Sequence, residues 1–134
     1  MNTDRRIWEQ MVRAALAVER PRQLSPLVEA GGVAAAVVSE SGAIYTGVCV
    51  DTASSPGGCA ERAAIFSLIT AGDNKVYRVA AIMSDGSVGP PCGACRELIA
   101  QMMPDRLDRV EILLAYPDIR TVALDQLLSM PWFA

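Results

Sequence analysis

The chain has 134 residues, a length that suits one domain and leaves no room for two. Apolar residues make up 51% and charged residues 20%, which excludes a disordered chain. The formal net charge of −3 argues against nucleic acid as a partner, and the absence of histidine excludes Ser-His-Asp triads, Cys-His dyads and histidine-ligated metals. We therefore expect any chemistry to come from Cys, Asp, Glu, Arg, Tyr, Ser or the backbone.

The first part of the chain predicts one helix and then a hairpin. Apolar residues at helical spacing predict a helix over Thr3–Glu19, which Pro21 ends. We expect a loop over Gln23–Gly32, followed by a β-hairpin of Val33–Ser39 and Ala43–Val50. The first strand of this hairpin is apolar without alternation, as expected for a sheet that is covered on both faces.

The rest of the chain alternates between the two element types. Helices are expected over Cys59–Ala71, Gly93–Met103 and Val122–Leu128, and strands over Val76–Ser84 and Arg109–Ala115. The resulting order α-β-β-α-β-α-β-α predicts a three-layer α/β/α sandwich around a mixed sheet, formed by a single domain over residues 1–134.

The amino end does not resemble a secretion signal, and no stretch reaches the roughly 20 apolar residues of a membrane span. We expect a cytoplasmic protein without a membrane partner, in which thiols stay reduced. The four cysteines Cys49, Cys59, Cys92 and Cys95 are then better suited to metal ligation than to disulfides.

Two short motifs predict a zinc site. Cys59 opens one expected helix, and the Cys-x-x-Cys pair of Cys92 and Cys95 opens another, each after a loop rich in Gly and Pro. Helix N-termini stabilise thiolates, and two crossover helices from one sheet edge bring their first turns together. Three thiolates with a fourth position left for water describe a catalytic Zn²⁺.

Charged residues beside these cysteines suggest the chemistry. Glu61 lies two residues after Cys59, close enough to pass protons between water and a substrate without binding the metal. Zinc with three thiolates is more negative than a site with a neutral imidazole, so a cation that donates to sulfur would offset the charge. Arg62 is our first choice for that cation, and Arg96 is the second. The machinery is that of hydrolytic deamination.

At these residues the sequence resembles the cytidine deaminase family, in its small branch with three cysteine ligands. The motifs are Cys59–Arg62 (Cys-Ala-Glu-Arg) and Pro91–Arg96 (Pro-Cys-Gly-Ala-Cys-Arg), with Ser41–Gly47 and the aromatic C-terminus in support. The resemblance implies a zinc-dependent aminohydrolase acting on a cytosine-type nucleoside and a homotetramer with shared sites. It also implies that the Ala60 N–H holds the base carbonyl and that the Pro90 carbonyl lies near the departing amine.

The region that would recognise the sugar departs from the family pattern. Family members usually carry Asn-x-Glu at the end of the second strand, and this chain has Cys49-Val50-Asp51. The family aromatic before the first strand is replaced by Gly31 or Gly32. The loop over Thr52–Gly58 is short, as in the similar blasticidin S deaminase branch. A blasticidin-like or other modified amino-heterocycle is therefore an alternative substrate.

Structural interpretations stand beside the functional ones. Cys49 could close the site as a fourth thiolate, which would make the chain a non-catalytic, zinc-stabilised binding domain. Alternatively, Cys49 is a small buried strand residue. Glu61 could simply be a first-turn carboxylate that the helix dipole stabilises. Asp51 could form a turn at the end of the hairpin, and Arg96 could be a solvated helix residue. Phe133 either packs within its own chain or, as the family suggests, lines a neighbouring subunit's site.

Overall fold

The computed structural model of the chain describes residues 2–133. Its helices are α1 (Asn2–Val18), α2 (Ala60–Thr70), α3 (Gly93–Met102), the 3-10 helix η1 (Leu107–Arg109) and α4 (Leu124–Leu127). Its strands are β1 (Arg22–Ser25), β2 (Val28–Ser39), β3 (Ile44–Thr52), β4 (Val76–Ile82), β5 (Glu111–Ala115) and β6 (Arg120–Ala123).

Strand β2 is the centre of one mixed sheet. Its residues 34–38 pair antiparallel with both β3 and β4, and its residues 28–30 pair with β3 and β1. Strand β5 runs parallel to β4, and β6 returns antiparallel to β5. The parallel β4–β5 pair needs a crossover, which α3 provides, so the loops that precede α2 and α3 meet at one edge of the sheet.

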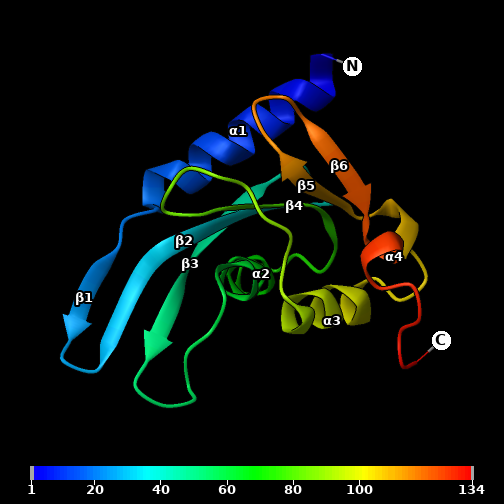
Figure 1. Cartoon of the computed structure of the whole chain (residues 1–134). Coiled ribbons are helices and arrows are strands. Elements are labelled where there is room, and N and C mark those ends of the chain that lie inside the picture. The colour runs from blue at the N-terminus through cyan, green and yellow to red at the C-terminus, as the bar shows by residue number, and fades with distance from the viewer. Residues whose placement is uncertain (1, 134) are drawn as a thin grey trace.

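Helices cover both faces of the sheet (Figure 1), which confirms the predicted three-layer sandwich. Helix α1 buries Trp8 and Met11 against one face, and α2 buries Ile65 and Leu68 against the other, together with Ile99 of α3. Alternate residues of β2 belong to the two cores, because side chains of a strand point to opposite faces in turn.

A row of very small residues lies beneath α2. Ala35 on β2 pairs with Gly47 on β3 and with Ala81 on β4, so the three share one face of the sheet. A Cβ built on Gly47 would lie 2.6 Å from the carbonyl carbon of Ala63 and closer still to the backbone nitrogen of Ala64. Helix α2 therefore approaches the sheet to backbone contact, which only this row of small side chains allows.

Two sequence predictions were wrong. The expected loop over Gln23–Gly32 contains most of β1 and the beginning of β2. Gly31 has a φ of +88° and coincides with the shift in pairing between Ala30 and Ala34, so the glycine marks an irregularity in a strand and not a loop. The expected helix from Val122 to Leu128 is shortened to α4, because pairing with β5 makes residues 120–123 a strand.

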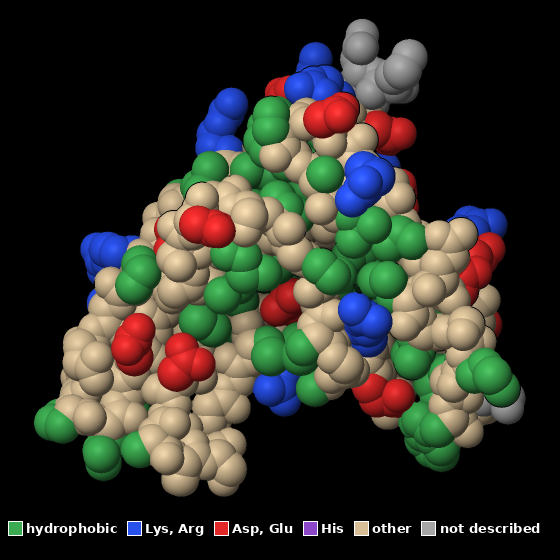
Figure 2. Space-filling model, viewed as in Figure 1, with side chains coloured by type: hydrophobic (Ala, Val, Ile, Leu, Met, Phe, Trp, Pro, Cys, Tyr) green, Lys and Arg blue, Asp and Glu red, His purple; other side chains and the backbone are tan. Residues whose placement is uncertain are grey.

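Acidic and basic side chains are interspersed over the face shown in Figure 2, so this face presents no extended basic patch. Among the described residues, no helix combines the length and the hydropathy that crossing a bilayer requires.

Candidate metal centre and its pocket

The three cysteines of the sequence motifs meet at the starts of two helices. Cys59 directly precedes α2, Cys92 directly precedes α3, and Cys95 lies in the first turn of α3. The Sγ of Cys92 is 3.2 Å from that of Cys59 and 3.6 Å from that of Cys95, and all three sulfurs lie within 4.8 Å of one another.

This donor set fits a zinc ion. A tetrahedral site with Zn–S bonds of about 2.3 Å needs sulfurs about 3.8 Å apart, so the observed separations require only small adjustments. Soft thiolates select Zn²⁺ over hard cations such as Mg²⁺ or Ca²⁺. Among the described residues the group contains three ligands, which leaves the fourth position of a tetrahedron to a small molecule.

The protein environment treats the three thiols differently. Burial raises the pKa of Cys95, and the Glu61 carboxylate raises it further; burial likewise raises the pKa of Cys59. Burial alone would also raise the pKa of Cys92, but donation from the backbone N–H of Cys95 and from the Cys59 thiol gives a net decrease. Burial therefore opposes ionisation of Cys59 and Cys95, and a cation beside the sulfurs would favour it.

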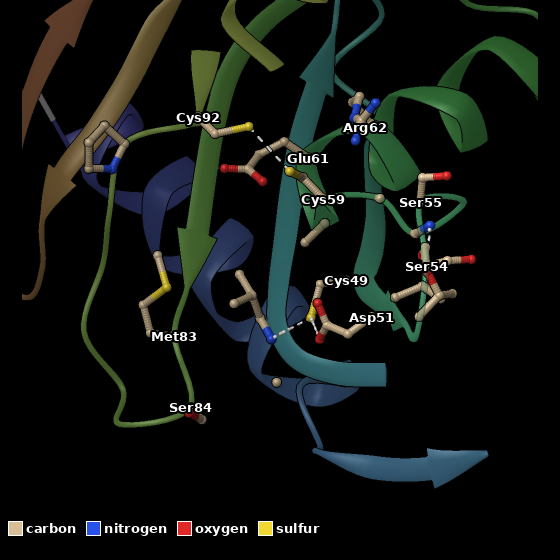
Figure 3. Close-up of a pocket in the computed structure, with 18 residues that line it drawn as sticks. Cys49, Asp51, Ser54, Ser55, Cys59, Glu61, Arg62, Met83, Ser84 and Cys92 are labelled. Atoms are coloured by element: carbon tan, nitrogen blue, oxygen red, sulfur yellow. Dashed lines mark hydrogen bonds between the residues drawn. The ribbon is translucent and has the colours of Figure 1, made fainter. Parts of the chain in front are cut away.

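Glu61 lies next to the sulfurs and is almost completely buried, with 5% of its surface exposed. Its Oε1 is 4.0 Å from the Cys95 Sγ, and Figure 3 shows its carboxylate beside the Cys59 and Cys92 sulfurs. Desolvation raises the pKa of Glu61 above its ordinary value, while the Arg62 charge partly opposes the increase. A raised pKa makes the Glu61 carboxylate a stronger base, which suits a group that accepts a proton and later releases it.

The two arginines that follow the motifs lie in different places. Interaction with the Cys59 sulfur is the largest influence on Arg62 and raises the pKa of its guanidinium, although the Arg62 Nε is buried without a hydrogen-bond partner among the described residues. Arg96 turns away from the sulfurs. Its Nε donates to the Pro91 carbonyl at 2.8 Å, and its Nη1 donates to the Leu127 carbonyl at 3.2 Å. The expected contact between Arg96 and sulfur is therefore not what the structure shows.

A pocket of about 670 Å³ opens from the sulfurs to the surface. Cys59, Ala60, Glu61, Pro90 and Cys92 line its wall, with Glu61 buried and Cys92 exposed. In Figure 3, Cys49 and Asp51 point into the same space from β3, because alternate residues of that strand face α2.

Comparison with known proteins identifies the family. Residues 6–110 match the family model described as the cytidine and deoxycytidylate deaminase zinc-binding region. The chain belongs to this family. The three cysteines and Glu61 all lie within the matched residues.

Individual deaminases are similar over different lengths. The cytidine deaminases of Halalkalibacterium halodurans and Sporosarcina psychrophila are 34% and 40% identical over 73 and 72 residues. These matches cover 54% and 52% of this chain and 55% and 52% of the relatives, so the chain matches about half the length of each relative. The crystal structure of the Mycobacterium leprae cytidine deaminase has a TM-score of 0.74 at 26% identity and covers 92% of this chain and 98% of that one. The Burkholderia pseudomallei structure has a TM-score of 0.71 at 28% identity, with the same coverages.

Cys49 and Asp51 line the part of the pocket where the sequence departs from the usual family pattern. The Cys49 Sγ accepts from the Val33 N–H at 3.2 Å and lies 3.9 Å from Asp51 Oδ2, and it does not belong to the metal-ligand group of the described residues. Ser54 and Ser55 also line the pocket. Sequence reasoning missed these serines because a loop of small polar residues has no pattern that indicates where it points.

Phe133 lies apart from the pocket of its own chain. It packs against the core on the α2 and α3 face of the sheet, with its ring edge-on to Trp132. Of its two predicted roles, packing within the same chain is the one for which the structure provides contacts.

Proposed function

We propose that this protein is a zinc-dependent aminohydrolase that converts a cytosine-type nucleoside, cytidine or deoxycytidine, into the corresponding uracil nucleoside and ammonia. The observation that carries the proposal is the buried Glu61 carboxyl, which lines a pocket beside three converging sulfurs. A purely structural zinc site does not require such a carboxyl group.

In this proposal Cys59, Cys92 and Cys95 hold the zinc, which when bound supplies a Lewis acid that activates water near neutral pH. Glu61 accepts one proton from the attacking water and gives it to the ring nitrogen; it then takes the second proton from the hydroxyl that the water has left on the ring carbon and passes it to the departing amino group. One water is consumed, the ring C–N bond breaks, a carbonyl forms and ammonia leaves, so no oxidant or reductant is needed.

The residues around Glu61 would hold the base. We assign the Ala60 N–H to the base carbonyl and the Pro90 carbonyl to the amino group that leaves. Arg62 supports the metal by offsetting the negative charge of three thiolates, because a guanidinium beside sulfur draws electron density from it.

The outer pocket favours a second substrate class within the same chemistry. Cys49 provides a thiol where the family usually has the amide of Asn, and Asp51 provides a shorter carboxylate where the family usually has Glu; both line the pocket. A hydroxyl group can still donate to Asp51, and the loss of the family's amide supports a modified cytosine compound as the alternative substrate. Asp51 and Cys49 are thus our proposed substrate-binding residues at this end.

We also propose that residues 1–134 act as one deaminase domain in the cytoplasm, assembled as a homotetramer. The assembly rests on the family resemblance and on exposed apolar side chains on α2, where Phe66 and Ile69 are 55% and 47% exposed. The same resemblance would place Phe133 at the site of a neighbouring subunit.

The test of the activity is Glu61→Gln in the zinc-loaded protein. We expect the variant to keep its fold and its zinc while ammonia release from cytidine falls by about 10²–10⁴-fold, the usual contribution of a positioned acid–base group. Glu40→Gln is the matched control, because Glu40 is exposed in the turn beyond the far end of β2 and should leave the rate unchanged. Undiminished ammonia release in Glu61→Gln would reject the proposed role.

A further inference from the structure

The segment that precedes Cys92 has few backbone hydrogen-bond donors of its own. It consists of Pro90 and Pro91 followed by Cys92, and two successive prolines have no backbone N–H to donate. Their carbonyl oxygens can still accept, so the segment depends on donors that other parts of the chain supply.

One residue of α3, Arg96, supplies a side-chain donor to the Pro91 carbonyl, and its backbone N–H makes the first-turn helix bond to Cys92. The Arg96 backbone N–H donates to the Cys92 carbonyl at 2.9 Å, and the Arg96 Nε donates to the Pro91 carbonyl at 2.8 Å. Arg96 thus engages two consecutive carbonyls, on both sides of the Cys92 nitrogen and α-carbon. Because each peptide unit is planar, holding these two carbonyls restrains the backbone from which the Cys92 sulfur projects.

The same guanidinium reaches the C-terminal part of the chain. The Arg96 Nη1 donates to the Leu127 carbonyl at 3.2 Å, at the end of α4, where helix carbonyls lack partners within the helix. The next residue of α3, Glu97, accepts from the Trp132 indole N–H at 2.8 Å. Two successive residues after Cys95 therefore attach the C-terminal segment to α3.

We propose that Arg96 is a positioning residue that fixes the Pro90–Cys92 segment and braces it against the C-terminal segment. Arg96 acts through the backbone of a ligand and not through its sulfur. The inference rests on the proposed zinc site but not on the identity of the substrate. A guanidinium suits this role because its donors point in two fixed directions, whereas an ammonium group is a single flexible point of charge.

Zinc affinity of the purified holoprotein, measured by competition with a chromogenic chelator, tests the proposal. We expect Arg96→Ala to weaken zinc binding by about 10–100-fold, the usual effect of removing a group that orients a ligand. Arg96→Lys should weaken zinc binding by only about tenfold, because an ammonium can donate to one of the two carbonyls that the guanidinium binds, those of Pro91 and Leu127.

Arg5→Ala is the matched control. Arg5 also donates to the carbonyl of a distant proline, Pro117, but it does so on α1, on the opposite face of the sheet. We expect zinc affinity in this variant to equal that of the unaltered protein. If Arg96→Ala does not fold, Arg96→Lys decides the question.

Wild-type zinc affinity in folded Arg96→Ala, or in Arg96→Lys where the alanine variant fails to fold, would overturn the proposal, even if the melting temperature falls. A graded loss of zinc across the two variants supports it. If the unaltered protein releases no ammonia from cytidine but the graded loss persists, the deaminase proposal fails and the positioning role stands. If ammonia is released and zinc affinity does not respond, the reverse holds.

Discussion

Replacing Gly47 by alanine should disturb the metal site from the opposite side of α2. The new Cβ would lie 2.6 Å from the carbonyl carbon of Ala63, whereas ordinary carbon contacts are about 3.5–4.0 Å, so the helix has to move by about 1 Å. Overpacking a core usually costs about 1–3 kcal/mol of unfolding free energy, and a clash with backbone belongs near the upper value. At roughly 4 °C per kcal/mol for a domain of this size, 3 kcal/mol lowers the melting temperature by about 12 °C.

Thermal unfolding followed by circular dichroism measures the effect of Gly47→Ala, and zinc content after dialysis shows whether Cys59 has moved with α2. Gly32→Ala is the control for stability, because a Cβ at Gly32 meets no atom within 4 Å. That variant should stay within about 1 kcal/mol of the unaltered protein. A Gly47→Ala protein as stable as Gly32→Ala would refute the inference that α2 touches the sheet at this glycine.

Two further predictions concern the metal. Metal analysis of the purified protein should find about one zinc per chain, and chelation should abolish ammonia release until zinc is added back; an active metal-free protein would contradict the proposed chemistry. Cys49→Ser should keep its zinc, because the Cys49 sulfur contacts the Val33 N–H and does not belong to the ligand group; zinc loss in this variant would instead indicate a closed site with four thiolates.

The layer architecture and the convergence of the cysteines were accessible from sequence because both follow from short-range patterns. The spacing of apolar residues in α1 and the Gly/Pro loops before Cys59 and Cys92 place the elements, and crossover geometry then brings the helix starts together. The absence of histidine from the whole chain and the two motifs between residues 59 and 96 were enough to predict the ligands.

The features that sequence reasoning missed depend on contacts between distant segments. Strand β6 exists because β5 offers it an edge, and Arg96 faces Pro91 and Leu127 because α4 ends beside α3. Neither the pairing of β6 nor the contacts of Arg96 can be predicted from a local sequence pattern. The glycines near residue 31 were misleading for the same reason, since a strand irregularity and a loop favour the same residue type.

The two ends of the pocket differ in how freely they can diverge. Glu61 and Cys59 begin a helix that lies directly on the backbone of Gly47, so a change in the layer beneath is transmitted to them. Asp51 and Ser55 lie near the end of β3 and in the loop that follows it, beyond the region where that helix crosses the sheet. A substitution at the rim can therefore alter which compounds enter the pocket without moving Glu61 or Cys59, whereas a substitution in the layer beneath α2 cannot.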